Sequence, residues 1–565
     1  MLFKNLHQKC LQGVEYLGYD EACVDILNTL NEPVTIFGQY DECHKCNFEN
    51  LTILGPQKNI SLPVSTRSPF ELYWSQQGGT ENCRFTKLLY EHYRYAWNIS
   101  SNCPKMEIKE PADDAYLPIL MAFVVLFSFG TLWYMVKCIY KNSGRLRQLL
   151  AWSTELEEDL TGSAPLVIER PPAIKKHPYR IKSVDVFRGL CIMLMIFVNY
   201  GGGQYWFFQH SAWNGITLAD LVFPWFLWLM GLSMTVSMQK KLHRAVPRRT
   251  IVFQVIRRSL VLLFLGIVVN SSKHILTVAE LRLPGVLQRI GITYFVVGML
   301  EVAFTKRIEF ESLSCVSDVI QAWPQWLFVS MLVAIHTCVT FLVYVPGCGK
   351  GYTGPGGLDD MKQHFNCTGG VAGYIDREVF GHHMLKTAAC NKVYENVVYF
   401  DPEGILGTLT AVLTVYLGVQ AGRTLNTYQN VRDKMIRWVL WGISAILIGG
   451  ILCEFKRDDG PIPINKQLWS LSYTLVTAGM AFLIQAFLFL MVDILRKWGG
   501  RPFFYPGMNA VFLYVGHEIF KNTFPFGWIP TVETHNAYLF MNLWGTFLWV
   551  AIAVYLYKHD TFFTI

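Results

Sequence analysis

The sequence predicts an all-α polytopic membrane protein with about eleven transmembrane helices, preceded by a small, disulfide-containing, β-rich luminal domain. Of its 565 residues, 52% are hydrophobic and only 16% are charged, whereas soluble domains carry about 25% charged residues. Apolar stretches of roughly 20 residues recur from residue 115 onward, the length that a bilayer requires. The basic residues flank these stretches and form no separate patch, so the composition excludes a nucleic-acid-binding protein.

Residues 1–110 are expected to form the luminal domain. This polar segment contains three N-glycosylation sequons, at Asn50, Asn59 and Asn98, and such sites mark surfaces of secreted domains. It also contains six cysteines, which fit a disulfide-stapled fold: Cys10, Cys23, Cys43, Cys46, Cys83 and Cys103. A cytosolic domain with reduced cysteines is the alternative. The chain start has no apolar signal-peptide core, so we expect that a signal peptide is missing from it or that the gene model is incomplete.

The flanking charges predict the orientation of the spans. The first span, 115–140, follows an acidic segment and precedes a basic one, which places the N-terminus in the lumen by the positive-inside rule. A cytosolic linker, 141–182, leads into a ten-helix domain, 183–558, and the tail 559–565 is cytosolic. The ten spans are expected at 184–201, 216–238, 251–269, 286–304, 324–345, 404–422, 437–454, 467–492, 502–520 and 538–557.

A long loop, 346–401, is also assigned to the lumen because it carries a fourth sequon at Asn366. Its cysteines are Cys348, Cys367 and Cys390. Together with the six upstream they make an odd number, so at least one thiol stays free. A disulfide between the N-terminal domain and this loop is one hypothesis that follows.

The stretch "NYGGGQYWFFQHSAWNGITLAD", from Asn199 to Asp220, joins two spans at the luminal face. Its three glycines allow close backbone approach or positive φ. His210 is a natural proton acceptor near neutral pH, and Asn199 is suited to orient its ring or to stabilise an oxyanion. Asp220 is either part of this site or a charge that favours the helix N-terminus. The aromatic residues suit either an interfacial belt or stacking on a sugar: Tyr205, Trp206, Phe207, Phe208 and Trp213.

Further charged residues lie inside or beside spans, where they are costly and often functional. Asp185 and Arg188, three residues apart, form either a salt bridge or an anion site. Of the adjacent Arg257 and Arg258, one is expected to face the bundle interior and to be able to hold a phosphate. Four others either line a cavity or form structural pairs: Arg289 near the luminal end of its span, and Asn509, His517 and Glu518.

The sequence contains no phosphate-binding P-loop, no dinucleotide fingerprint and no zinc-ligand spacing. Cys43-x-x-Cys46 has no second pair beside it, which favours a disulfide or a turn over a metal site. No metal is therefore expected.

Residues 179–530 resemble the heparan-α-glucosaminide N-acetyltransferase family of lysosomal membrane enzymes. The resemblance lies in "DVFRGLCIMLMIFVNYGGGQYWFFQHSAWNGITLADLVFPWF", "RLPGVLQRIGITYFVV", "NKQLWSLSYT" and "FLYVGHEIF". The resemblance implies a multi-pass enzyme of the lysosomal membrane that takes part in heparan sulfate degradation. It also implies that the enzyme is a homodimer. Such an enzyme uses acetyl-CoA from the cytosol as donor and the terminal non-reducing α-glucosamine of heparan sulfate as luminal acceptor.

The resemblance also implies site residues. His210 is the catalytic candidate and Asn199 the second active-site residue, with Asp220 beside them. From the residues themselves, and not from the resemblance, we expect Arg188, Arg257, Arg258 and Arg289 to hold the anionic donor. His210 is either a general base in a direct transfer or the carrier of an acetyl group in a ping-pong reaction; direct transfer is the preferred scheme.

Two other classes of protein remain as alternatives. A transporter of a small anionic or sugar substrate would explain the intramembrane charges, although transporters usually place their sites near the midplane of repeated halves, and no repeat is evident. A receptor or adhesion protein would explain the glycosylated N-terminal domain.

Overall fold

The computed structural model describes residues 10, 17–76, 82–100, 103, 105–112, 114–142, 181–271, 281–305, 317–385, 390–396 and 398–563. The chain divides into two units, one of residues 113–180 and one of everything else. The smaller unit contains the first apolar helix, α2 (Leu117–Asn142). Most of the expected cytosolic linker, residues 143–180, lies outside the described residues.

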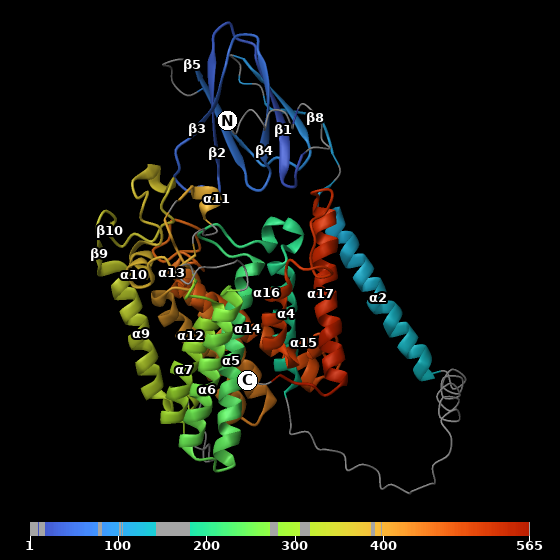
Figure 1. Ribbon diagram of the computed structural model, residues 1–565, viewed down its shortest axis with the longest axis vertical. Helices are drawn as coiled ribbons and strands as arrows, with labels where there is room; N and C mark the ends of the chain where they lie inside the picture. Colours follow the sequence, from blue (N-terminus) through green and yellow to red (C-terminus); the bar gives the residue numbers. More distant parts are fainter. Residues whose placement is uncertain are drawn as a thin grey trace. The chain divides into compact units, whose positions relative to one another are not determined.

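The N-terminal domain is a β-sandwich, drawn in blue in Figure 1. One sheet has the strand order β4-β1-β7-β8 and the other β3-β2-β5-β6; β1 and β7 are parallel, and the other pairs are antiparallel. Inward-facing residues of both sheets form one hydrophobic core that includes Trp74, Tyr95 and Trp97, as strand alternation requires. The strands are β1 (Glu21–Asn28), β2 (Val34–Tyr40), β3 (Glu49–Leu54), β4 (Asn59–Ser65), β5 (Phe70–Gln76), β6 (Asn82–Lys87), β7 (Arg94–Ile99) and β8 (Glu107–Glu110).

Disulfides confirm the stapled N-terminal domain but contradict the bridge proposed between it and the luminal loop. The pairs are all local: Cys10–Cys23, Cys43–Cys46, Cys83–Cys103 and Cys348–Cys367. Cys390 is the loop thiol that stays free. It is buried and accepts a hydrogen bond from Asn396, and this burial raises the pKa of the Cys390 thiol to about 11.

The helices confirm the polytopic membrane architecture. Within the described residues, nine helices are long and apolar enough to cross a bilayer. α4 and the α15–α16 pair complete the eleven expected segments: α4 carries Lys182, Asp185 and Arg188, and the expected span 502–520 is broken at Asn509. The α-helices described after α2 are α4 (Lys182–Asn199), α5 (Leu218–His243), α6 (Arg248–Ser271), α7 (Val286–Phe304), α8 (Ser317–Ile320), α9 (Trp323–Leu342), α10 (Gly370–Phe380), α11 (Asn391–Tyr394), α12 (Ile405–Thr427), α13 (Val431–Leu452), α14 (Leu471–Leu488), α15 (Phe504–Met508), α16 (Ala510–Phe520) and α17 (His535–Lys558).

Two helix starts differ from the sequence expectation by four residues or more, and α5 and α12 each end five residues later than expected. α13 begins at Val431 instead of residue 437, because its first turn contains the polar "VRDKMIR" that hydropathy alone leaves out. α14 begins at Leu471 instead of residue 467, because Ser470 is its N-cap: the Ser470 hydroxyl accepts the Tyr473 backbone N–H. The preceding residues are thereby left in a loop.

Glycines at helix crossings bring the central helices of the bundle together (Figure 1). α5 packs on α12 and α4 packs on α15. A Cβ at Gly231 of α5 would collide with the Val415 carbonyl of α12, and one at Gly418 with the Trp228 carbonyl. In a bilayer, such small residues permit the close packing that replaces the hydrophobic driving force between helices.

The β-sandwich contacts the loops at one end of the bundle. Arg67 Nη1 donates to Gln209 Oε1 over 2.7 Å, and Lys45 Nζ lies 3.1 Å from Asp459. The loop between α4 and α5, the loop 453–470 and the N-terminal domain therefore share one end. The loops with clustered basic residues, after α5, α12 and α14, join the opposite ends of these helices, as the charge pattern predicted.

Candidate active site

The glycine-rich loop begins directly after α4 and turns sharply. Gly201, Gly202 and Gly203 have φ values of 122°, 59° and 69°, which favour glycine over residues with a Cβ. The Gly203 N–H donates to Asn542 Oδ1 of α17 over 2.8 Å. The expected positive φ is thus confirmed, and the turn leads the chain back across the end of the bundle to His210.

Asp220 lies in the first turn of α5 and is completely buried. Its Oδ2 accepts the backbone N–H groups of Ser211 and Thr217, each over 3.2 Å, and the Thr217 hydroxyl over 2.9 Å. Its Oδ1 is 2.8 Å from His210 Nδ1. Asp220 therefore both closes the N-terminus of α5 and holds His210 by a hydrogen bond.

The hydrogen bond to Asp220 defines the tautomer of His210. An ionised carboxylate can only accept, so Nδ1 carries the proton and the neutral ring keeps a lone pair on Nε2. The His210 side chain is 40% exposed. Part of the ring is therefore open to solvent.

Lys466 is the third member of this cluster, although the sequence analysis gave it no role. Its Nζ lies 2.9 Å from His210 Nδ1, 3.3 Å from His210 Nε2 and 3.3 Å from Asp220 Oδ1. These distances place the ammonium over the face of the ring, close to both nitrogens. Removal of the ring from water and the nearby Lys466 charge together lower the pKa of His210, outweighing Asp220.

Loop 453–470 positions Lys466. Asn214 and Asn465 form an isolated β-bridge, and Asn465 Nδ2 donates to Asn214 Oδ1 over 3.0 Å. The Gly215 N–H donates to the Ile464 carbonyl over 2.8 Å. These bonds hold the loop that carries Lys466 against the loop that carries His210.

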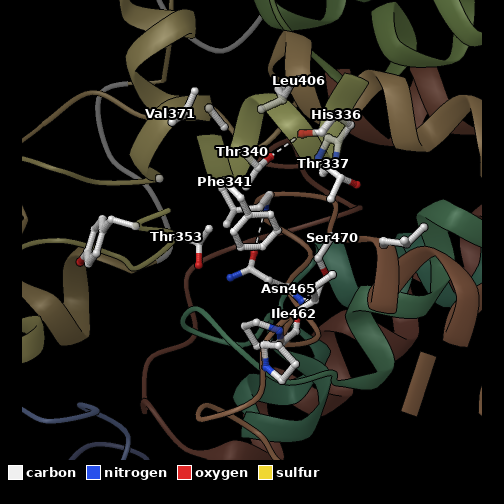
Figure 2. A pocket seen from close by; sticks show the side chains of 17 residues that line it. His336, Thr337, Thr340, Phe341, Thr353, Val371, Leu406, Ile462, Asn465 and Ser470 are labelled. Carbon is white, nitrogen blue, oxygen red and sulfur yellow. Dashed lines mark hydrogen bonds between the residues drawn. The ribbon is translucent and has the colours of Figure 1, made fainter. Parts of the chain in front are cut away.

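A small cavity of about 40 Å³ lies next to the loop of Lys466 (Figure 2). It is bordered by His336 and Thr340 of α9, Leu406 of α12, and Asn465 and Ser470 of loop 453–470. This volume suits an ordered water molecule and is too small for a sugar.

Asn199 does not join this cluster in the structure. Its Nδ2 donates to His517 Nε2 and to Glu518 Oε1, both over 2.9 Å. His517 Nδ1 is 3.1 Å from the Leu513 carbonyl, so this nitrogen carries the proton and Nε2 accepts from Asn199. The described hydrogen bonds of Asn199 thus connect α4 to α16. Of the three residues expected to lie together, only His210 and Asp220 are in contact in the described structure.

Two relatives cover almost the whole chain. The chain is 36% identical over 586 residues to heparan-alpha-glucosaminide N-acetyltransferase of Mus musculus, covering 97% of this chain and 89% of the mouse protein. It is also 36% identical over 593 residues to the Homo sapiens protein of the same name, covering 97% and 88%. The chain belongs to the heparan-alpha-glucosaminide N-acetyltransferase family. Residues 180–316 additionally match a domain of unknown function, DUF5009.

In this member of the heparan-alpha-glucosaminide N-acetyltransferase family, three of the four arginines predicted to hold the donor lie far from His210. Arg188 lies in the half of α4, and Arg257 and Arg258 in the half of α6, that is remote from His210. Arg188 Nη1 is 3.3 Å from Asp185 Oδ1, and Nη2 donates to Ser233 over 2.7 Å, so the salt bridge is present. Arg257 is exposed. The half-buried Arg258 guanidinium lies 4.6 Å from the Tyr294 ring of α7.

Arg289 is separated from those three arginines. It lies in the first turn of α7, donates to the Gly404 carbonyl over 3.0 Å and stacks on Trp469 at 4.8 Å. This is the His210 end of the bundle, because α7 runs antiparallel to α6. The structure therefore separates Arg289 from Arg188, Arg257 and Arg258, with which the sequence grouped it.

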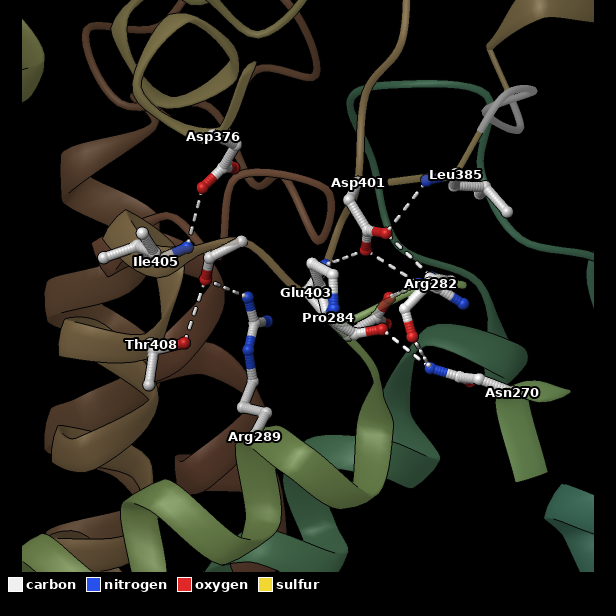
Figure 3. A network of polar contacts seen from close by, with 11 residues as sticks. Asn270, Arg282, Pro284, Arg289, Asp376, Leu385, Asp401, Glu403, Ile405 and Thr408 are labelled. Atoms are coloured by element: carbon white, nitrogen blue, oxygen red, sulfur yellow. Dashed lines mark hydrogen bonds and ion pairs between the residues drawn. The ribbon is translucent and has the colours of Figure 1, made fainter. Parts of the chain in front are cut away.

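A charged network, shown in Figure 3, holds the starts of α7 and α12 beside the site. Arg282 makes two 2.7 Å hydrogen bonds to Asp401 and also pairs with Glu403. These bonds raise the pKa of Arg282 and, despite burial, lower that of Asp401. Asp376 accepts the Ile405 N–H over 2.9 Å at the start of α12, and burial raises its pKa to about 6.

The aromatic residues of the glycine-rich loop divide into two groups. Tyr205 and Trp213 are each only 1% exposed, and Trp213 Nε1 donates to the Thr353 carbonyl over 3.0 Å. They pack the loop in place and are not available for stacking. Trp206 is 45% exposed and can still contact either lipid or sugar.

Proposed function

We propose that this chain is a transmembrane acetyltransferase of the lysosomal membrane. It transfers the acetyl group of cytosolic acetyl-CoA to the amine of the terminal non-reducing α-glucosamine of heparan sulfate, a step in heparan sulfate degradation. The observation that carries the proposal is the hydrogen bond from His210 to Asp220, in a chain that is 36% identical to heparan-alpha-glucosaminide N-acetyltransferases over nearly its whole length.

The acceptor chemistry requires a base. A glucosamine amine is protonated in an acidic lumen and cannot attack until it loses a proton. His210 Nε2 is suited to remove that proton because its lone pair is exposed while Nδ1 is held by Asp220. A general base of this kind contributes about 10²–10⁴-fold to the rate.

Lys466 adjusts this base to an acidic compartment. An ammonium 3.3 Å from Nε2 disfavours a second positive charge on the ring. The lowered pKa of His210 keeps more of the ring neutral at a given acidic pH. In this proposal Lys466 acts through His210 and does not itself react.

In direct transfer the atoms balance without a covalent enzyme intermediate. His210 Nε2 takes one proton from the acceptor ammonium, the free amine attacks the thioester carbonyl carbon, and the carbon–sulfur bond breaks. The second amine proton passes to the leaving CoA sulfur, and His210 releases the first to the lumen. In the ping-pong alternative, Nε2 attacks the thioester first and the acetyl-imidazole then meets the amine.

The donor binds from the opposite side in this proposal. CoA phosphates stay at the cytosolic ends of α4 and α6, where Arg188, Arg257 and Arg258 supply positive charge, and the thin pantetheine arm reaches toward His210. Arg289 instead supports the acceptor end: its hydrogen bond to Gly404 and its stacking on Trp469 brace the segment that follows Lys466. Asn199 is a positioning residue that secures the end of α4 before the glycine-rich loop.

The test uses the full chain in liposomes loaded with a glucosamine-terminated heparan oligosaccharide and supplied externally with labelled acetyl-CoA. We expect acetylated oligosaccharide inside the liposomes from the wild type, none above background from His210→Ala, and wild-type product from His382→Ala, an exposed histidine of the luminal loop. Transport of unmodified oligosaccharide without acetylation would instead support the transporter alternative. An acetylated His210 trapped with acetyl-CoA alone would replace direct transfer with the ping-pong scheme.

A further inference from the structure

Three metal-ligand side chains meet between the β-sandwich and α17, away from His210. Asp20 precedes β1, Glu91 precedes β7, and His535 is the first residue of α17. One ligand atom from each lies within 4.8 Å of the other two. Glu91 is 9% exposed and His535 is 4% exposed. The cluster is therefore largely shielded from solvent, unlike a cluster of charged residues on the surface.

The ring of His535 is held in one orientation. Nδ1 donates to the Gly203 carbonyl over 2.8 Å, and the ring stacks on Tyr205 with centroids 4.1 Å apart. Nε2 therefore faces the two carboxylates. A histidine that donates one ring N–H to a backbone carbonyl and presents its other nitrogen to carboxylates has the arrangement typical of metal-binding histidines.

The spacing of the ligand atoms suits a cation between them. Nε2 lies 3.4 Å from Asp20 Oδ1 and 3.1 Å from Glu91 Oε2, and one N–H cannot point at both oxygens. Tetrahedral zinc with bonds of about 2.1 Å would place its ligand atoms roughly 3.4 Å apart. The two carboxylates carry two negative charges, which one divalent cation bound through a deprotonated Nε2 would neutralise; another nearby basic group is His92, 3.6 Å from Glu91 Oε1.

We propose that Asp20, Glu91 and His535 bind one divalent cation of the zinc class, with a water molecule in the fourth position. One imidazole and two carboxylates suit zinc or manganese better than calcium, which prefers oxygen ligands alone, or copper(I), which prefers sulfur. The cation fastens the N-terminal domain to α17. Through the bond from His535 to Gly203, it also braces the glycine-rich loop that leads to His210.

The experiment titrates Co²⁺, as a visible-absorbing substitute for zinc, into the purified full chain in detergent at pH 7.5 after removal of metals. We expect one equivalent to bind, the absorption to disappear on addition of Zn²⁺, and Glu91→Gln and His535→Gln to weaken binding about tenfold or more. The matched control is Glu533→Gln, an exposed carboxylate two residues from His535, which should bind like the wild type. Absent binding, or equal binding by the wild type and His535→Gln, would leave only an ion pair and overturn the proposal.

A second measurement covers variants that fold poorly. Because a ligand that binds only the folded state stabilises it, Zn²⁺ should raise the melting temperature of the metal-free wild type and leave that of His535→Gln unchanged. A wild-type melting temperature that is identical in Zn²⁺ and in EDTA would contradict the site.

Discussion

His210 and Asp220 stand 2.8 Å apart, Nδ1 to Oδ1, with the carboxylate buried and the ring partly exposed. The pair resembles the orienting half of a catalytic triad, in which a buried carboxylate sets the histidine tautomer. The Asp220 side chain also pairs with Lys466 and accepts backbone N–H groups and a hydroxyl that close the helix N-terminus.

The variant Asp220→Asn tests this orientation. The new amide would still accept hydrogen bonds through its one oxygen, but its NH₂ group would donate to His210 Nδ1 and favour the tautomer with the proton on Nε2. We expect kcat for acetyl transfer to fall by about 10²–10⁴-fold, with N-glycosylation and melting temperature close to wild type. A loss of activity that merely follows loss of folded protein would contradict an orienting role.

Lys466 should control the acid limb of the pH profile. The lowered pKa of His210 keeps the base neutral as the pH falls, and kcat/KM declines only when His210 becomes protonated. Lys466→Met removes the neighbouring charge, so the acid limb should move to higher pH. Lys466→Arg keeps the charge and should leave the limb near its wild-type position. Equal displacement in both variants would indicate that side-chain shape matters instead of charge.

Asp376 should make the folded state less stable as the pH rises. Its pKa of about 6 in the folded protein lies above the value of about 4 for an unfolded aspartate. The folded state therefore binds the proton more tightly, and stability decreases between about pH 4 and 6.

Asp376→Asn keeps an acceptor for the Ile405 N–H and removes the buried charge. Its melting temperature should exceed that of the wild type at pH 7, corresponding to at most about 3 kcal/mol, and should vary less between pH 4 and 6. Glu378→Gln, an exposed carboxylate on the same short helix, is the control. Parallel melting curves for wild type and Asp376→Asn across this range would show that Asp376 is not the titrating group.

The crossing of α5 and α12 should tolerate no added methyl group. Gly231→Ala places a Cβ against the Val415 carbonyl, which belongs to the backbone and cannot rotate away. We expect a loss of stability of about 1–3 kcal/mol, as for other overpacked interiors, measured by thermal unfolding in detergent. Gly130→Ala in α2 has open space around its Cβ and should be neutral, so a similar loss in both variants would point to a general glycine effect.

Much of the architecture could be predicted from the sequence. α7 has the bounds that hydropathy predicted, and α5, α6 and α12 lie within a few residues of them. The differences occur where a polar turn begins α13 and where Ser470 delays α14. Such boundaries depend on hydrogen bonds to individual side chains, which average hydropathy does not register.

The candidate site was only partly predictable. His210 and Asp220 stand out because they are close in sequence on either side of a helix start. Lys466 lies 256 residues from His210 and sits in a polar loop where a lysine is unremarkable. The motif "NKQLWSLSYT" was a signal for the segment but not for the role of its lysine.

The sequence by itself determined the spans and the location of the glycine-rich loop, because apolar length is a local property of the chain. Only the tertiary structure decided which polar residues meet. The docking of loop 453–470 on the loop of His210 brings Lys466 to the His210 ring. The packing of α4 against α16 brings Asn199 within hydrogen-bonding distance of His517. These contacts depend on backbone hydrogen bonds and helix crossings between segments that are distant in sequence. A local sequence pattern does not specify the geometry of such crossings.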